Sequence, residues 1–406
     1  MTSMTVLQNS LLALLLFFIQ PTFLAGLALT FLSKSRRYRY TRKQLRAAIY
    51  KENFEMKRFL LWGLIPGLIL SVLSVLIGLP VTLDWIILYN IISILFLGFG
   101  YRFIHPIFTF SASAILLMLY QLFLSQDSLF LPITTLWESP FLEGSPETAF
   151  EGGQVILILT LLLLVSSILT MHIGKLTQFI PNFLKTKRGK LVARYRMNPL
   201  WMVPLLVIVP GDTFTQLFSW WPVFSIGNQT FSFLILPVLV GFRYTVQAQM
   251  PTQAKQALLK DFVALSVVGI IIFALSFWVI ELAAVGLLVL FLGGGYVLYR
   301  HRLRERTWTF RFGPEQEGLK VVAVRPGSPA DKMNIEIGDT LLECNQVKLN
   351  DSEDFVESLF NNRAYCKLKI KRVDGELVMT ETAIYEDDPH DLGLMTLEDI
   401  TLTNGY

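Results

Sequence analysis

The chain has 406 residues, of which 53% are hydrophobic and only 16% are charged, and its mean hydropathy is +0.52. Because a soluble protein carries about a quarter charged residues, this composition excludes an ordinary soluble enzyme and indicates an integral membrane protein. The formal charge of +4 is small, and we predict no nucleic-acid partner because no nucleic-acid-binding fold accompanies the basic residues. The first residues lack the basic start and cleavage site of a signal peptide.

Apolar runs that can cross a bilayer as helices, which takes about 20 residues, recur through the first three quarters of the chain. The predicted spans are 11–32, 60–80, 85–104, 107–124, 154–173, 199–217, 229–247, 261–279 and 282–299. Pro204, Pro210 and Asp212 interrupt the sixth of these spans and predict a kinked or broken helix there. The last two spans are nearly continuous and predict a tight helical hairpin that turns at Glu281.

The loops between these spans differ in charge, which predicts their side of the membrane. Lys and Arg gather over 34–46, 175–196 and 300–306, whereas 125–153 contains five acidic residues and no Lys or Arg. By the positive-inside rule, the basic loops and the C-terminal part are cytoplasmic, and the acidic loop is outside. The basic loops are also expected to contact anionic lipids. The aromatic-rich segment 34–58 is alternatively a docking surface for a cytosolic partner.

No catalytic constellation appears in the predicted membrane part. The four histidines stand apart and none belongs to an H-E-x-x-H pair, so an intramembrane zinc protease would lack its ligands. No G-x-S-x-G elbow and no paired intramembrane aspartates are present. Cys344 and Cys366 are too few for a disulfide framework and are expected to be reduced, buried thiols. The sequence therefore predicts no catalytic residue, no metal site and no cofactor.

The last quarter of the chain has the pattern of a small α+β domain. The predicted order is strand 307–312, strand 319–324, helix 328–334, strand 340–345, helix 351–361, and a hairpin of strands 367–373 and 376–384. Ser328 and Asp351 are good helix N-caps, and Asp374-Gly375 is typical of a hairpin turn. We therefore divide the chain into a transmembrane domain of about eight or nine helices (1–306), a soluble module (307–385) and an acidic tail (386–406). The tail is expected to be solvated, or else to act as a self-peptide.

Three motifs of this module resemble a bacterial PDZ domain. They are Gly318-Leu319, the run Pro326-Gly327-Ser328-Pro329-Ala330 and Ile337-Gly338-Asp339, and the helix 351–361 follows them. The resemblance implies that a peptide C-terminus adds as a strand between 319–324 and the helix 351–361. It also implies that Gly318, Leu319 and Val321 form the end that receives the carboxylate.

Two features of the module leave the groove undecided. Either Phe355 with Leu359 or Val356 with Phe360 faces the groove, and the other pair belongs to the core. The segment Glu315–Glu317 is acidic and would repel a carboxylate, and Lys320 stands where the PDZ pattern usually has glycine.

Two short segments of the membrane part resemble MinJ-type proteins of Gram-positive bacteria. These segments are Phe17-Phe18-Ile19-Gln20-Pro21 and Gly63-Leu64-Ile65-Pro66-Gly67-Leu68-Ile69-Leu70-Ser71. The resemblance implies a topological determinant of cell division, enriched at septum and poles, that bridges a DivIVA-like protein to a MinD-like protein. Gly63 and Gly67 also have the spacing of close helix packing, either within the chain or in a homo-oligomer.

The predicted fold class is therefore an α-helical polytopic membrane domain followed by a small α+β PDZ domain, a partly open β-barrel or sandwich with two helices. The preferred function is a non-enzymatic scaffold at the cell membrane, with its PDZ domain in the cytoplasm. The alternative is a membrane receptor or protease-regulating adaptor that senses peptide C-termini. A transporter ranks below both, because no ionisable residue is expected at mid-membrane.

Overall fold

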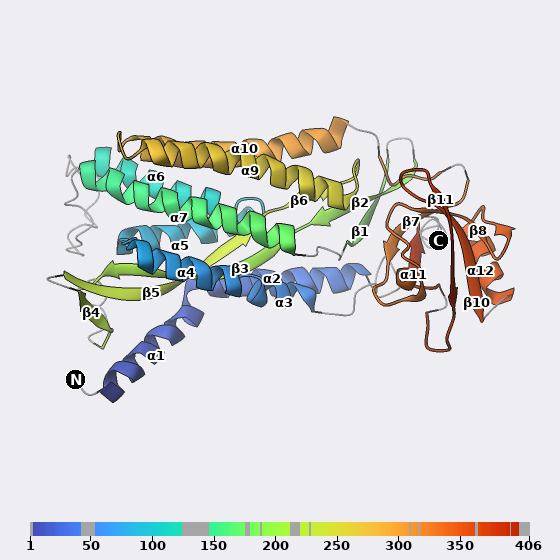
Figure 1. Cartoon of the computed structure of the whole chain (residues 1–406), viewed down its shortest axis with the longest axis horizontal. Helices are drawn as coiled ribbons and strands as arrows, with labels where there is room; N and C mark the ends of the chain where they lie inside the picture. Colours follow the sequence, from blue (N-terminus) through green and yellow to red (C-terminus); the bar gives the residue numbers. More distant parts are fainter. Residues whose placement is uncertain are drawn as a thin grey trace.

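The computed structural model describes residues 3–41, 53–123, 146–174, 179–186, 189–211, 220–226, 229–307, 310–315, 317–361, 364–389 and 391–397. A long helical bundle occupies one end of the molecule, and a compact C-terminal module of strands and short helices occupies the other (Figure 1). Residues 125–145 of the acidic loop that is predicted to face outward lie outside the described residues.

The bundle consists of helices with apolar, outward-facing side chains. They are α1 (Ser3–Ile19), α2 (Pro21–Tyr40), α3 (Phe54–Leu61), α4 (Leu64–Ile77), α5 (Leu83–Gly98), α6 (Pro106–Phe123), α7 (Pro146–Ile173), α9 (Pro251–Leu275) and α10 (Leu282–Thr307). Within the described residues, four segments are long and apolar enough to cross a membrane: Phe54–Ile77, Ala149–Ile173, Pro251–Leu275 and Leu282–Thr307. The chain bends by 46° between α1 and α2, and this pair would make a fifth span. The protein is thus a helical membrane protein, as its composition predicts.

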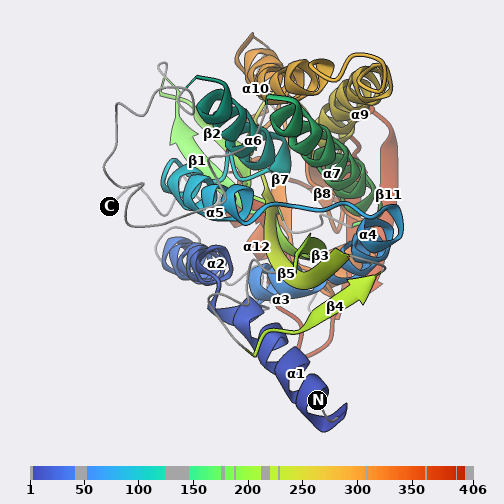
Figure 2. The same cartoon turned by 90° about the vertical axis from the view of Figure 1, so that its left-hand side faces the viewer.

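The predicted helical spans 199–217 and 229–247 are wrong. The chain there forms two long strands, β3 (Leu200–Pro210) and β5 (Gln229–Gly241), which pair antiparallel, and β4 (Val223–Ile226) pairs with β5. Viewed along the bundle, β3 and β5 lie in its middle with helices around them (Figure 2). Strands buried on both faces read as continuous apolar runs, so their hydropathy resembles that of a spanning helix.

The outer edge of β3 is closed by side-chain and backbone groups of neighbouring segments. The Ser71 hydroxyl accepts a hydrogen bond from the Leu206 amide at 2.9 Å and donates to the Pro204 carbonyl at 3.3 Å. The Val81 amide donates to the Ile208 carbonyl at 2.8 Å. Non-helical backbone at membrane depth is tolerated where protein surrounds it and satisfies its polar groups, and these contacts meet that requirement.

The outer edge of β5 is closed in the same way. The Gln20 side chain donates to the Ile235 carbonyl at 2.6 Å, and the Tyr89 hydroxyl donates to the Pro237 carbonyl at 3.2 Å. Pro204 and Pro237 face each other in the register of the two strands. Because proline has no N–H group, this pair leaves no backbone donor to satisfy at that level of the bundle.

Two glycines let α4 approach β3. A Cβ at Gly63 would lie 1.7 Å from the Met202 carbonyl oxygen, and a Cβ at Gly67 would lie 2.6 Å from the Pro204 ring. No larger residue fits at either position without a shift of the β3 backbone. The structure therefore supports the interpretation that these two glycines pack within the chain.

A small sheet connects the bundle to the C-terminal module. It has the order β1 (Pro181–Lys185), β2 (Leu191–Met197), β6 (Tyr244–Val246). The C-terminal ends of α2 and α10, which carry much of the predicted basic segments, lie at this same end of the bundle (Figure 1). The predicted edge strand 307–312 is wrong: Thr307 ends α10, and residues 311 and 312 hydrogen-bond to Gln247 and Ala193 beside the small sheet.

Candidate functional site

The C-terminal module is a sheet flanked by two helices. Its elements are β7 (Leu319–Val324), α11 (Pro329–Lys332), β8 (Thr340–Cys344), β9 (Val347–Lys348), α12 (Ser352–Asn361), β10 (Tyr365–Lys371), β11 (Leu377–Ala383) and β12 (Leu394–Thr396). The strands are ordered β11-β10-β8-β7-β12, and β9 pairs with β8. Except for β9 and β12, which were not predicted, these elements follow the predicted order from residue 319 onward closely.

The predicted caps explain where the two helices begin. Ser328 accepts a hydrogen bond from the Asp331 amide at the start of α11. At α12, Asp351 accepts from the Asp354 amide at 2.9 Å, and Asp354 in turn accepts from the Asn350 amide at 2.9 Å. This reciprocal arrangement satisfies amides at the helix start that have no partner within the helix.

The structure decides which face of α12 belongs to the core. Phe355 and Leu359 are buried, whereas Val356 is 45% exposed and Phe360 is 57% exposed. The buried pair lies in one apolar cluster with Leu319 and other β7 and β8 side chains. Of the two alternatives that the sequence leaves open, Phe355 and Leu359 therefore form the core pair, and Val356 and Phe360 form the outward pair.

The predicted receiving strand β7 has a neighbour on each side. On one side it pairs with β8, where Leu319 lies opposite Leu341. On the other side it pairs with β12, where Leu394 lies opposite Val324 and the Leu397 amide donates to the Lys320 carbonyl at 3.0 Å. β12 therefore occupies the edge of β7 to which the resemblance assigns the peptide, and the peptide site itself stays a prediction.

The remaining predicted site residues are part of this packed sheet. Leu319 and Val321 are fully buried in the core of the module. Gly318 has a φ of 82°, and a Cβ there would lie 2.4 Å from the Leu341 carbonyl oxygen. Only glycine adopts this conformation without strain, so Gly318 lets the chain enter β7 beside β8.

Part of the acidic tail (386–406) is buried, whereas its acidity predicts a solvated segment. Residues 392–397 are buried, with Leu392 and Leu394 in the core of the module. Met395 and Leu397 face the other way, into the core of the bundle and the small sheet. The signal for this strand was the apolar run Leu392-Gly393-Leu394-Met395 within an otherwise acidic segment. Residues 398–406, for which a self-peptide is the alternative prediction, lie outside the described residues.

Lys320, which stands where the PDZ pattern usually has glycine, pairs with one carboxylate of the acidic segment before β7. The Lys320 ammonium group donates to the Glu315 carboxylate, and the Thr340 hydroxyl donates to the same carboxylate at 3.1 Å. Burial opposes the charge of Glu315, but the hydrogen bond and positive charge of Lys320 outweigh it, so the pKa of Glu315 lies below its ordinary value. Lys320 thus removes part of the repulsion predicted for this loop.

The module is docked firmly on the small sheet. The Tyr195 hydroxyl on β2 donates to the Val322 carbonyl on β7 at 2.6 Å. Val322 and Ala323 share one apolar cluster with Tyr195 and Phe312. Arg311 reaches the Val373 carbonyl at 3.2 Å. These contacts join one face of the module to the core of the bundle and the small sheet, while most apolar side chains of the module form a separate cluster.

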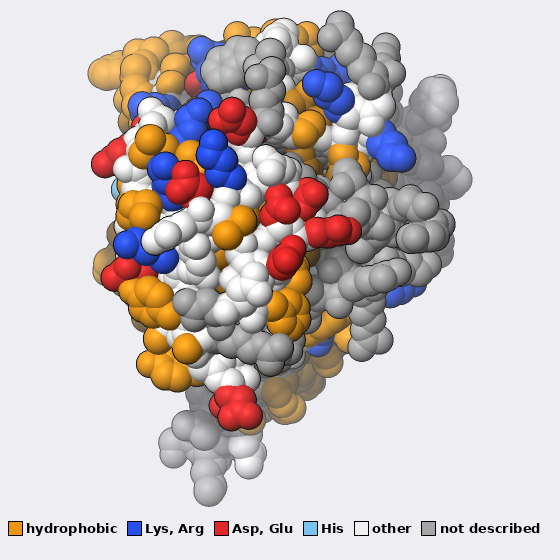
Figure 3. Space-filling model, turned by 90° about the vertical axis from the view of Figure 1, so that its right-hand side faces the viewer, with side chains coloured by type: hydrophobic (Ala, Val, Ile, Leu, Met, Phe, Trp, Pro, Cys, Tyr) orange, Lys and Arg blue, Asp and Glu red, His pale blue; other side chains and the backbone are white. Residues whose placement is uncertain are grey.

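The face of the module that points away from the bundle carries interspersed acidic and basic side chains with small apolar patches between them (Figure 3). The exposed apolar residues of the module include Val347, Val356, Phe360, Leu377, Met379 and Tyr385. Within the described part of the chain, no group of three or more His, Cys, Asp or Glu side chains is placed to hold a metal ion. Cys344 and Cys366 are buried free thiols with their sulfurs 3.8 Å apart, as the cysteine count predicts.

Together, the fold and the module define a polytopic helical membrane protein with a C-terminal PDZ domain. Residues 309–383 match the PDZ domain family, which confirms the predicted fold class. The chain is 27% identical over 384 residues to the "Cell division topological determinant MinJ" of Bacillus subtilis (strain 168), covering 95% of this chain and 94% of that protein. It is also 26% identical over 229 residues to the "Probable cell division topological determinant MinJ" of Lacticaseibacillus paracasei, covering 54% of this chain and 59% of that protein. The predicted resemblance is thus confirmed: the chain is similar to MinJ-type proteins along 95% of its length and carries a C-terminal PDZ domain.

Proposed function

We propose that this protein is a non-enzymatic membrane scaffold that places cell-division proteins. The observation that carries the proposal is the similarity to a cell division topological determinant along 95% of the chain, combined with a PDZ domain held rigidly on the membrane bundle. PDZ domains recruit partners by binding extended peptides. A domain fixed on a membrane bundle serves to hold such a partner at the membrane.

The docking surface that we propose is centred on the outward face of α12. Val356 and Phe360 offer apolar contact area there, and Phe355 and Leu359 anchor the helix from beneath. Gly318, Leu319 and Val321 hold the sheet behind this helix and do not contact the partner. The PDZ domain faces the cytoplasm in this proposal, because the basic ends of α2 and α10 lie beside it.

The finer proposal concerns the partners and the place of action. By its MinJ-type resemblance, the scaffold connects a DivIVA-like protein that marks septum and poles to a MinD-like division inhibitor. The protein would then be enriched at septum and poles. The recruiting step needs only binding energy, so this function requires no catalytic residue, metal ion or cofactor.

A fluorescent fusion of the full chain in its native host tests the proposal. We expect enrichment at septa and poles, and misplaced septa after deletion of the gene. Uniform membrane fluorescence together with normal septa after deletion would overturn it.

A pair of surface variants tests the docking face. Val356→Asp should abolish co-purification of the division-site partners with the full chain, because it places a charge in the apolar contact. Val347→Asp is the matched control, since Val347 is 47% exposed on β9 and Val356 is 45% exposed on α12. Equal partner recovery with both variants would exclude the α12 face. Altered cleavage of a membrane protease's substrate after deletion of the gene would instead support the adaptor alternative.

A further inference from the structure

Two adjoining cavities lie at the end of the bundle that carries the PDZ domain, and each has a volume of about 370 Å³. The first lies between α2, α3 and the small sheet, and the second lies between that sheet and α10. They share Arg196 and Arg243. We name the two cavities together the arginine cleft. Its lining arginines are Arg36, Arg37, Arg58, Arg102, Arg194, Arg196, Arg243, Arg302 and Arg306.

The carboxylates that line the cleft, within the described residues, are already used by other groups. Glu55 is held by Arg37 through two contacts, at 2.5 Å and 2.9 Å. Glu305 accepts from the amides of Gln247 and Ala248 at 2.7 Å and 2.8 Å, and from the Gln249 side chain at 2.7 Å. The cleft therefore has a large excess of positive charge that its own acidic residues do not balance.

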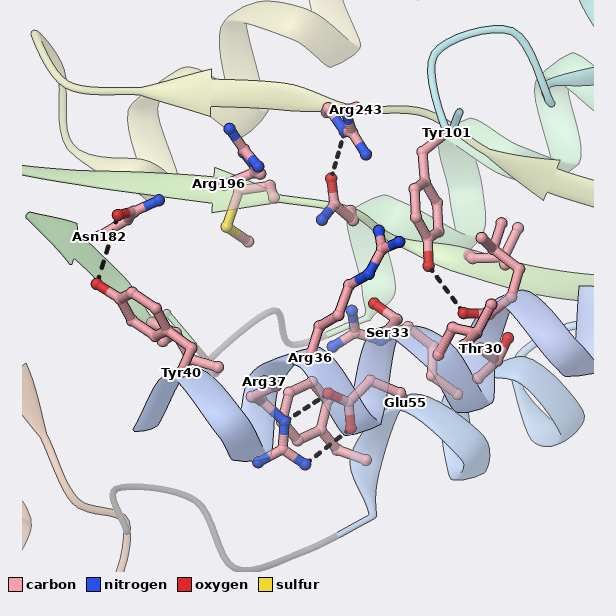
Figure 4. A pocket seen from close by; sticks show the side chains of 18 of the residues that line it. Thr30, Ser33, Arg36, Arg37, Tyr40, Glu55, Tyr101, Asn182, Arg196 and Arg243 are labelled. Atoms are coloured by element: carbon pink, nitrogen blue, oxygen red, sulfur yellow. Dashed lines mark hydrogen bonds and ion pairs between the residues drawn. The ribbon is translucent and has the colours of Figure 1, made fainter. Parts of the chain in front are cut away.

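The arginines of the cleft act on one another. Arg36 points from α2 toward Arg196 on β2 and toward Arg243, which lies between β5 and β6 (Figure 4). Burial and the positive charges of Arg196, Arg102 and Arg36 lower the pKa of Arg243. The Asn198 side chain, which accepts from Arg243 at 3.0 Å, and the Tyr101 ring, 5.5 Å from its guanidinium carbon, are neutral. An anion between these guanidinium groups would relieve their repulsion.

Among the residues that line the second cavity, three buried polar atoms have no hydrogen-bond partner. They are Nε of Arg194, the hydroxyl of Tyr244 and Nδ1 of His301. The other ring nitrogen of His301 donates to the Thr245 carbonyl at 3.1 Å, so Nδ1 of the neutral ring is an acceptor and contributes no hydrogen bond to an anion. Buried polar atoms without partners are rare in folded proteins and are destabilising. Arg194 and Tyr244 thus provide two donors without partners among the residues of this cavity.

Arginine clusters with neutral donors match the chemistry of phosphate, whose oxygens accept several N–H and O–H hydrogen bonds at once. We propose that the arginine cleft is a binding site for a phosphate ester. The apolar residues at the rim of the arginine cleft indicate which molecule carries the phosphate group. Leu29 and Leu32 of α2 line the first cavity, and exposed apolar side chains, including Phe31 and Leu32, continue along the same helix. This continuity fits the headgroup and acyl chain of an anionic phospholipid.

The test uses the purified, delipidated full chain and measures its thermal unfolding and lipid retention. We expect phosphatidylglycerol in mixed micelles to raise the melting temperature relative to phosphatidylcholine, because a ligand that binds the native state stabilises it. Arg196→Gln should weaken phosphatidylglycerol binding about tenfold, since it removes a charged hydrogen-bond donor. Tyr244→Phe removes only the unpartnered hydroxyl and should weaken binding without lowering the melting temperature in phosphatidylcholine.

Arg39→Gln is the matched control, because Arg39 is exposed on α2 and lines neither cavity. Inorganic phosphate and glycerol phosphate form the second arm. If these soluble probes bind with the same dependence on Arg196 and Tyr244 while phosphatidylglycerol is no better than phosphatidylcholine, the phosphate site stands and its source is a soluble ester. If neither probe responds to Arg196→Gln and Tyr244→Phe, or if Arg39→Gln weakens binding equally, the proposal is overturned.

Discussion

Gly63 lies directly against the carbonyl group of Met202, so closely that a Cβ at Gly63 would be 1.7 Å from that oxygen. The contact joins α4 to the buried strand β3. It also places the Gly63–Ser71 segment, one of the two that carry the MinJ-type resemblance, on the backbone of the hairpin. Gln20 of the other segment reaches β5. Both segments are therefore surfaces that hold the β3–β5 hairpin within the helices.

The first prediction is that Gly63→Ala destabilises the bundle. The added methyl group meets backbone, so α4 must move away from β3, and overpacking of this kind costs about 1–3 kcal/mol or more. Thermal unfolding of the full chain in detergent measures the loss. Gly152→Ala on α7 is the control, because a Cβ at Gly152 would have no other atom within 4 Å. Equal melting temperatures for the two variants would contradict the close approach of α4 and β3.

The second prediction concerns Ser71, whose hydroxyl bridges the Leu206 amide and the Pro204 carbonyl. Ser71→Ala leaves both backbone groups without this partner, and we expect a loss of about 1–3 kcal/mol in the free energy of unfolding. Ser74→Ala on the same helix is the control, since the buried Ser74 hydroxyl has no hydrogen-bond partner. If Ser74→Ala were the more damaging of the two, the proposed closure of the β3 edge would be wrong.

The third prediction is that β12 is an integral strand of the PDZ domain. Leu394 is buried against β7, so Leu394→Ala should cost about 2–5 kcal/mol and accelerate hydrogen exchange of the β7 amides. Leu377→Ala is a matched control, because Leu377 is exposed on β11. Unchanged exchange in β7 after truncation at residue 385 would show that β12 contributes nothing to the domain.

The fourth prediction follows from the lowered pKa of Glu315. A carboxyl group whose folded pKa lies below its unfolded value stabilises the fold above the unfolded pKa, and that contribution is lost as the pH falls through the folded pKa. The unfolded value is 4.5, so the Glu315–Lys320 contribution should be complete at neutral pH and disappear progressively below about pH 4.5. Unfolding of the PDZ domain measured from pH 6 to 3 should be less pH-dependent in Glu315→Gln. An identical pH dependence in the variant and the wild type would argue against the pair.

Much of the PDZ domain could be predicted from local signals. The caps at Ser328 and Asp351 and the turn at Asp374-Gly375 locate two helices and a hairpin to within a few residues. The role of each α12 face could not be predicted, because both pairs have helical spacing and similar hydrophobicity. Only the packing of Phe355 and Leu359 on the sheet distinguishes them.

The β3–β5 hairpin could not be predicted from hydropathy. Its two strands are 11 and 13 residues long and apolar throughout, and such runs are read by default as helices because isolated strands cannot satisfy their backbone in lipid. Pro204 and Pro237 were the available signal against regular helices. What makes the strands possible is long-range: Ser71, Tyr89 and Gln20, which supply the missing hydrogen bonds, lie more than 130 residues away in the sequence.

The arginine cleft is equally a product of distant segments. Arg36, Arg196 and Arg243 belong to three separate parts of the chain and meet only in the fold. The sequence signal for Arg36 and Arg196 was the basic character of the segments 34–46 and 175–196, which predicted lipid contact but no particular cavity; Arg243 lies in neither segment. The partnerless atoms of Tyr244 and His301 had no signal in the sequence.

The hydrogen bond from Tyr195 to Val322 and the core shared across it have a consequence for how a partner is captured. A domain on a flexible tether searches a volume set by its linker, and its effective concentration near a second site falls as that linker lengthens. Here the distance and angle between α12 and the bundle are fixed by packing. In the proposed scaffold, a partner that engages the PDZ domain would therefore be held at one distance from the bundle and in one orientation.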